Sequence, residues 1–254
     1  MESMSNKVSI ITVCYNCYKD LEKTIKSVLS QTYANKEYLI IDGGSTDGTK
    51  QVLQEYNSKI DFIVCEPDNG IYDAMNKGIK MATGDWIICM NAGDVFTSEN
   101  ILSNIFSHNI PSHKSFIYSD FWLFHEDGSR TFRHTDRKLG EIHHQNAIYR
   151  KSLHEQYGYY IVTHPYIVSD FLFFMAIPED QYLKIDTPIA NIQAGGISDN
   201  LWCCEQTWAV KVVYGIETIP QIFIRDIRFR FGLWRQRIKK RIKNILFTNQ
   251  QNTK

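Results

Sequence analysis

The strongest constraint on the fold is the alternation, between Val8 and Phe106, of short apolar runs with amphipathic segments. The apolar runs have the length and the β-branched content of buried strands, and the segments between them place apolar side chains at helical spacing. Strands are expected at 8–15, 38–41, 61–65 and 86–90, and helices at 20–31, 49–56 and 73–82, with a fourth helix that Ser98 caps. Strands and helices that alternate in this way form βαβ units, so we expect an α/β fold with a mainly parallel central sheet flanked by helices.

Polar clusters follow all four expected strands. They are Tyr15-Asn16, Asp42 to Asp47, Glu66 to Gly70, and Asn91 to Asp94. The carboxyl ends of parallel strands meet at one edge of a sheet, and α/β sheets bind their ligands there. The sequence therefore predicts one polar site built from these clusters.

After Pro111 the pattern is less regular. The runs 116–124 and 130–134 flank Glu126-Asp127-Gly128, which predicts a β-hairpin, whereas 143–149 and 162–175 mix aromatic and polar residues. We expect this half to complete the sheet and to form a second wall of the site. Residues 1–220 are expected to form one domain and residues 221–254 a separate tail.

Several classes of protein find no support in the sequence. Gly48 is followed by Thr49-Lys50, whereas a phosphate-binding P-loop needs Lys directly after its last glycine, and no GxGxxG motif is present. ATPases and dinucleotide oxidoreductases are therefore disfavoured. No apolar run approaches the roughly 18 residues that cross a bilayer, and none resembles a signal peptide. We expect a cytoplasmic protein whose six cysteines, Cys14-x-x-Cys17 among them, are reduced thiols.

Two acids stand out as candidates for chemistry. Asp94 ends the turn Asn91-Ala-Gly-Asp94, where a carboxylate suits a hard divalent ion that keeps phosphate and water ligands, although a capping role explains it equally well. Asp170 lies within the apolar and aromatic run 166–175, so it must be paired or face a cavity. Apolar surroundings would raise its pKa and make it a better proton acceptor near neutral pH.

Other polar residues allow two interpretations each. Asp73 lies at an expected helix start, where capping alone explains it, and Lys77 one turn later could face a phosphate or only solvent. His143-His144-Gln145 could contact a substrate or have a purely structural role.

The tail has a distinct composition. The formal net charge of the chain is +0, yet residues 225–254 hold ten basic residues and one acid. Apolar residues recur there every three or four positions: Ile227, Phe231, Trp234, Ile238, Ile242 and Ile245. A basic amphipathic helix with aromatic residues fits a membrane interface, where each basic residue contributes about 1 kcal/mol. Docking against its own domain is the alternative, and the continuous apolar stripe argues against nucleic acid.

Taken together, five stretches resemble glycosyltransferase family 2, whose members have the GT-A fold. They are Val8 to Asn16, Ser30 to Thr32, Ile40 to Thr49, Asn76 to Ile79, and Gly84 to Asp94. The chain is most similar to bacterial enzymes that build O-antigen (lipopolysaccharide), capsule or exopolysaccharide. It departs from the family pattern at Gly43 and Gly93, each of which replaces an acid.

The resemblance implies a role for each matching residue. The catalytic base falls on Asp170, and Asp94 would bind Mn²⁺ or Mg²⁺. The residues implied on the acceptor side are His144, Gln145 and Ser169. The implied donor-binding residues are Thr12, Val13, Tyr15, Asp42, Asp68, Asn76, Lys77, Asn91, Ala92 and Gly93.

The function implied by the resemblance is an inverting transfer of a hexose from a nucleotide-diphospho-sugar, with a UDP-sugar as the expected donor. The acceptor would be a hydroxyl of a lipid-diphosphate-linked glycan, so the enzyme would lie on the inner face of the cytoplasmic membrane through its tail. A sugar nucleotidyltransferase and a non-catalytic membrane-bound adaptor are the alternatives. A glycoside hydrolase would need two facing carboxylates, and it would leave the glycine-rich loops without a role.

Overall fold

The structure is a computed structural model, and it describes residues 6–162, 168–196 and 201–251. The chain divides into two compact units, Met1–Thr207 and Trp208–Lys254. This division falls within a helix and lies ahead of the boundary expected after residue 220.

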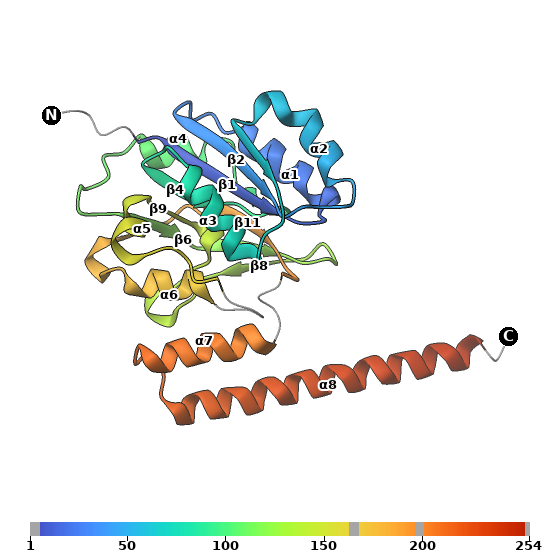
Figure 1. Ribbon diagram of the computed structural model, residues 1–254. Coiled ribbons are helices and arrows are strands. Elements are labelled where there is room, and N and C mark those ends of the chain that lie inside the picture. The colour runs from blue at the N-terminus through green and yellow to red at the C-terminus, as the bar shows by residue number, and fades with distance from the viewer. Residues whose placement is uncertain (1–5, 163–167, 197–200, 252–254) are drawn as a thin grey trace. The chain divides into compact units, whose positions relative to one another are not determined.

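A seven-stranded sheet forms the centre of the first unit (Figure 1). Its order is β10-β6-β9-β4-β1-β2-β3. The strands are β1 Val8–Cys14, β2 Lys36–Asp42, β3 Phe62–Cys65, β4 Trp86–Cys89, β6 Phe116–Ser119, β9 Ala147–Arg150 and β10 Tyr182–Ile185. Every neighbouring pair is parallel except the two that β9 makes with β4 and β6. The mainly parallel sheet predicted from the sequence is confirmed.

The helices of the first half follow the strands in the expected order. They are α1 Tyr18–Leu29, α2 Thr49–Tyr56, α3 Ile71–Met81 and α4 Ile101–Phe106, with a short turn of 3-10 helix, η1 Asn57–Lys59, after α2. The expected N-cap at Ser98 is wrong, because Asn100 is the N-cap of α4, which begins at Ile101. The Asn100 side chain instead accepts a hydrogen bond from the Thr32 hydroxyl at 2.8 Å.

A second, four-stranded sheet has the order β5-β11-β7-β8. Its strands are β5 Val95–Phe96, β7 Phe121–Phe124, β8 Arg130–Arg133 and β11 Ala190–Gln193. The antiparallel pair of β7 and β8 is the predicted hairpin, and Gly128 supplies the positive φ of 80° that its turn needs. The single strand expected at 116–124 is wrong, because the chain passes from one sheet to the other at Asp120. The Asp120 carboxylate fixes this switch by accepting hydrogen bonds from the Thr135 amide at 2.8 Å and Lys184 Nζ at 2.7 Å.

The remaining elements of this unit are short. They are η2 Arg137–Leu139, η3 His144–Asn146, α5 Ser152–Tyr157, α6 Ser169–Ala176 and η4 Glu179–Gln181. Of these, η3 leads directly into β9, and α6 carries Asp170 in its first turn.

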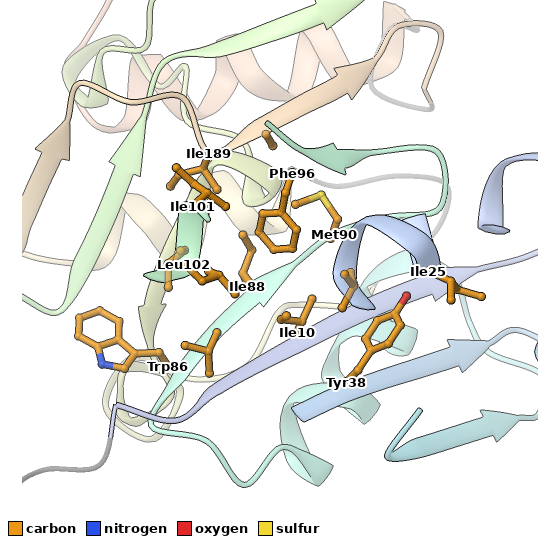
Figure 2. Packing of buried hydrophobic residues seen from close by; sticks show 14 of the residues in the cluster. Ile10, Ile25, Tyr38, Trp86, Ile88, Met90, Phe96, Ile101, Leu102 and Ile189 are labelled. Atoms are coloured by element: carbon orange, nitrogen blue, oxygen red, sulfur yellow. The ribbon is translucent and has the colours of Figure 1, made fainter. Parts of the chain in front are cut away.

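Apolar side chains cover both faces of the central sheet, because successive residues of a strand point to opposite sides. One cluster lies on the α1 and α4 side and contains Ile10, Ile25, Tyr38, Trp86, Ile88 and Phe96 (Figure 2). The other contains Ile11, Ile41, Met75, Tyr149 and Phe174. A sheet buried on both faces explains why its strands read as continuous apolar runs rather than as alternating patterns.

The second unit contains the C-terminal part of α7, Leu201–Val213, and all of α8, Ile219–Gln251. Within it, Glu217 pairs with Arg225 at 2.6 Å and with Lys211 at 3.4 Å, and the rings of Trp208 and Phe229 meet edge to face. No helix of the described residues is both long enough and apolar enough to span a membrane.

Candidate active site

The turn from Asn91 to Asp94 lies at the carboxyl end of β4. The Asp94 amide donates to the Asn91 carbonyl at 3.0 Å, and Gly93 has a φ of 103°, which a residue with a Cβ rarely adopts. Thr24 of α1 fastens the turn from outside. Its hydroxyl accepts a hydrogen bond from the Gly93 amide at 2.9 Å and donates to the Asp94 carbonyl at 2.8 Å. The turn is therefore held rigidly against α1.

The Asp94 carboxylate is buried, and each of its oxygens accepts one hydrogen bond among the described residues. The backbone amide of Gln193 donates to its Oδ1 at 2.8 Å, and Nε2 of Gln145 donates to its Oδ2 at 2.9 Å. Burial raises the pKa of Asp94 to about 6, although both hydrogen bonds oppose this rise. An anionic side chain in such a place is well suited to a cationic partner.

The Asp170 carboxylate is held at both of its oxygens. The Tyr72 hydroxyl of α3 and the Phe171 amide donate to Oδ1 at 2.8 and 2.9 Å, and Nδ1 of His144 donates to Oδ2 at 2.9 Å. Burial acts to raise the pKa of Asp170, but the hydrogen bonds from His144 and Tyr72 outweigh it and hold the pKa below its ordinary value. The expectation that apolar surroundings raise this pKa is wrong, because polar partners replace water around the carboxylate.

Two adjacent residues, His144 and Gln145, join the two acids. His144 bonds to Asp170 and Gln145 bonds to Asp94, so both carboxylates face one site although 76 positions separate them in the sequence. The other ring nitrogen of His144, Nε2, lies 2.8 Å from Nδ2 of Asn91. A continuous chain of hydrogen bonds thus runs from Tyr72 through Asp170 and His144 to the turn that carries Asp94.

Several predicted donor-binding residues use their polar groups inside the protein. The Thr12 hydroxyl pairs with that of Tyr38 at 3.0 Å, and Val13 is buried in the core. Asp42 is fully buried and accepts hydrogen bonds from the amide and hydroxyl of Ser45. The Asn76 amide bonds at both ends to the backbone of Tyr160.

Other predicted residues lie around the ends of β1 to β4. Tyr15 is exposed, Ala92 is half-buried, and Lys77 pairs with Glu66 at 2.9 Å. The Asp68 carboxylate occupies the space that a Cβ at position 43 would need, so the glycine there allows this acid to approach the backbone.

Ser169, predicted on the acceptor side, accepts a hydrogen bond from the Ile161 amide at 2.6 Å. Sequence reasoning missed Tyr72, Thr24 and Gln193 as supports of the two acids. The available signal for Tyr72 was that a tyrosine hydroxyl in the interior of a protein usually has a hydrogen-bond partner.

The family model described as glycosyl transferase family 2 matches residues 9–158. The chain belongs to this family. This match covers more than half of the chain. It includes the turn at Asp94 and the pair His144-Gln145, but it ends before Asp170.

The relatives include a glycosyltransferase and a polysaccharide synthase. An uncharacterized glycosyltransferase of Mycobacterium tuberculosis is 37% identical over 97 residues, which are 38% of this chain and 37% of that protein. The poly-beta-1,6-N-acetyl-D-glucosamine synthase of Staphylococcus epidermidis is 34% identical over 94 residues, which are 36% of this chain and 23% of the synthase. The chain therefore covers less than half of the length of either relative.

Solved structures have the same fold. TarS of S. aureus, crystallised with UDP-GlcNAc, has a TM-score of 0.66 at 17% identity, over 83% of this chain and 66% of that chain. The mannosyltransferase PcManGT of Pyrobaculum calidifontis, in complex with GDP-Man and Mn²⁺, has a TM-score of 0.57 at 18% identity, over 72% of this chain and 55% of that chain. The GT-A fold expected from the sequence is confirmed.

Members of the GT-A fold typically use a divalent metal, and the donor groups at Asp94 fit one. Two amide oxygens, Oδ1 of Asn91 and Oε1 of Gln145, are buried without a hydrogen-bond partner among the described residues. Together with the Asp94 carboxylate they offer oxygen atoms, which Mg²⁺ and Mn²⁺ prefer. Within the described ranges no group of three or more His, Cys, Asp or Glu side chains forms a metal site. A site to which the protein contributes so few oxygen ligands suits an ion that also binds phosphate oxygens.

Proposed function

We propose that this chain is an inverting glycosyltransferase of bacterial surface polysaccharide synthesis. It transfers a hexose from a UDP-sugar to a hydroxyl of a lipid-diphosphate-linked glycan. The observation that carries the proposal is the joining of Asp94 and Asp170 by His144 and Gln145. The polysaccharide synthase among the relatives and the UDP-GlcNAc bound to the structural neighbour support the choice of substrates.

The donor diphosphate is assigned to the turn at Asp94. A divalent cation bound there would neutralise the charge that develops on the departing diphosphate. Asp94 and the amide oxygens of Asn91 and Gln145 are the residues that would hold it. Thr24 keeps the turn in place, and Asp94 itself is buried.

Asp170 is assigned as the general base. Its lowered pKa keeps it ionised at neutral pH, so nearly every molecule has a carboxylate that can accept the proton of the acceptor hydroxyl. As this proton moves to Asp170, the hydroxyl oxygen bonds to the anomeric carbon, and the bond from that carbon to the diphosphate breaks on the opposite face. The product carries the inverted configuration. Base catalysis of this kind contributes about 10²- to 10⁴-fold to the rate.

The test is a transfer assay with the purified chain, a synthetic lipid-diphosphate acceptor, and a panel of UDP- and GDP-sugars, each with Mn²⁺ or with EDTA. We expect a glycosylated lipid and free nucleoside diphosphate from a UDP-hexose, with inverted anomeric configuration by NMR. Retention of configuration would contradict the mechanism. Release of inorganic diphosphate from a nucleoside triphosphate and a sugar phosphate would identify a nucleotidyltransferase instead.

We further propose that α8 holds the enzyme on the inner face of the cytoplasmic membrane. Phe223, Ile227, Phe231 and Trp234 are each more than half exposed, and ten basic residues lie between Arg225 and the end of the chain. Apolar and cationic side chains together favour an anionic lipid surface.

Vesicle flotation of the full chain tests this assignment of α8. The variant Phe231→Ser with Trp234→Ser should release the protein from phosphatidylglycerol vesicles, whereas Val213→Ser, which changes an exposed residue outside α8, should not. Removal of residues 225–254 should likewise shift the protein from the membrane to the soluble fraction of cells. Unchanged binding of the double variant would exclude this role of the helix.

A further inference from the structure

We propose that His144 is a positioning residue for Asp170: it orients the carboxylate and links it to the turn that holds the donor. This inference rests on the proposed function. Its basis is that one imidazole ring bonds to Asp170 through Nδ1 at 2.9 Å and to Asn91 through Nε2 at 2.8 Å.

The two contacts determine the tautomer of the ring. An ionised carboxylate only accepts hydrogen bonds, so Nδ1 of His144 must carry a proton. The amide Nδ2 of Asn91 only donates, so Nε2 must be the unprotonated nitrogen. His144 is therefore held as the Nδ1–H tautomer, and this arrangement fixes the rotation of the ring.

The partners of Asp170 also determine which of its atoms is open. Each carboxylate oxygen has two lone pairs. Oδ1 uses both, because it accepts from the Tyr72 hydroxyl and from the Phe171 amide. Among the described residues Oδ2 accepts from His144 alone, which leaves its second lone pair available. The proton of the acceptor hydroxyl is thus assigned to Oδ2, and the direction of its free lone pair is set by His144.

Another buried histidine shows what a purely structural role looks like in this protein. His154 stacks on Phe173 and contacts the hydroxyl of Tyr149 and the carbonyl of Gly158, with no acid among these partners. His144, by contrast, contacts the two side chains to which the proposed reaction assigns the base and the donor turn. Its side chain is 10% exposed, so both contacts of the ring lie almost entirely inside the protein.

Two substitutions separate the two contacts of the ring. The amide nitrogen of Asn lies near the position of Nδ1, so His144→Asn retains a donor toward Asp170. The amide group of Gln reaches the position of Nε2, so His144→Gln retains the contact with Asn91 and loses the donor toward Asp170. We expect kcat to fall about 100-fold in His144→Gln and less than about 10-fold in His144→Asn, as for other residues that orient a reacting group. The KM for the donor should change less than about 3-fold in both, because His144 is not among the residues assigned to the donor diphosphate and its cation.

The matched pair gives clear outcomes in the transfer assay. Equal loss of kcat in both variants, or a rise in donor KM without loss of kcat, would overturn the positioning role. If the wild-type chain transfers no sugar to any acceptor of the panel, the proposed function fails instead.

A measurement on the wild-type protein needs neither activity nor a variant that folds. In ¹⁵N NMR spectra of the histidine side chains, the His144 ring should show a protonated Nδ1 and an unprotonated Nε2. The opposite tautomer would overturn the inference whether or not transfer is observed.

Discussion

Replacing Glu37 by Gln should destabilise the first unit without changing the turnover of the folded enzyme. Glu37 lies near the start of β2, at the opposite end of this strand from the polar clusters of the site. Its buried carboxylate accepts hydrogen bonds from the Ser9 hydroxyl at 2.6 Å and from the Thr83 amide and hydroxyl, each at 2.6 Å. Lys7 adds an ion pair at 2.7 Å. These contacts join β1, β2 and the loop before β4.

The expected loss of stability follows from the pKa of this carboxyl. Burial acts to raise the pKa of Glu37, but the bonds from Lys7, Ser9 and Thr83 lower it from 4.5 to about 2. A difference of about 2.5 pH units corresponds to about 3.4 kcal/mol of unfolding free energy. Because the folded-state pKa is the lower one, this contribution is complete well above pH 4.5 and is lost as the pH falls toward 2. At pH 4 about 2.6 kcal/mol of it should remain.

Urea unfolding followed by hydrogen exchange of peptides from β1 and β2 measures this unit separately from α8. Glu37→Gln should lower the unfolding free energy by about 3 kcal/mol at pH 7, and its deficit relative to the wild type should shrink at pH 4. Lys7→Met removes the partly exposed ion pair and the hydrogen bond from Lys7 to the Thr83 hydroxyl, and it should cost about 1 kcal/mol or less. A deficit below about 1 kcal/mol for Glu37→Gln, or one independent of pH, would refute the reasoning.

Three further predictions concern the site and its surroundings. Asp170→Asn should lower kcat by about 10²- to 10⁴-fold while calorimetry finds the donor Kd unchanged; normal turnover would exclude Asp170 as the base. Thr24→Val should raise the Kd for Mn²⁺ about 10-fold by electron paramagnetic resonance, whereas Thr24→Ser, which keeps the hydroxyl, should not. Burial lowers the pKa of His154 from 6.5 to about 4, so as the pH falls this histidine binds a proton in the unfolded chain before it does so in the folded protein. The unfolding free energy of the wild type should therefore fall by about 2 kcal/mol by pH 5, and that of His154→Gln should not show this loss. A wild type without this loss in urea titrations would show that His154 is not held neutral.

The first half of the fold was predictable because each of its elements leaves a local pattern. The expected strands and helices up to residue 90 match the observed ones to within a few residues, since apolar periodicity reflects burial directly. The later errors have non-local causes. The pattern of residues 116–124 does not reveal that Asp120 is held by Thr135 and Lys184, and it is this contact that separates β6 from β7.

The site was partly predictable for the same reason. Asp94 and Asp170 are conspicuous in their local surroundings, and the structure brings both to one place. The direction in which the pKa of Asp170 shifts was not predictable, because its partners His144 and Tyr72 lie 26 and 98 positions away in the chain. The supporting hydroxyl of Thr24 likewise acts across a contact of 70 positions, which no local pattern records.

The reversed direction of β9 has a consequence for how this family can diversify. Because β9 runs antiparallel to its neighbours, the residues that precede it in the chain lie at the ligand edge, and those that follow it do not. The preceding residues here are His144 and Gln145. The segment just before β9 can therefore vary between homologues independently of the strands that come earlier in the chain. Exchanging it between homologues would change the residues that hold the Asp170 and Asp94 carboxylates, while β1 to β4, which come earlier in the chain, stay as they are.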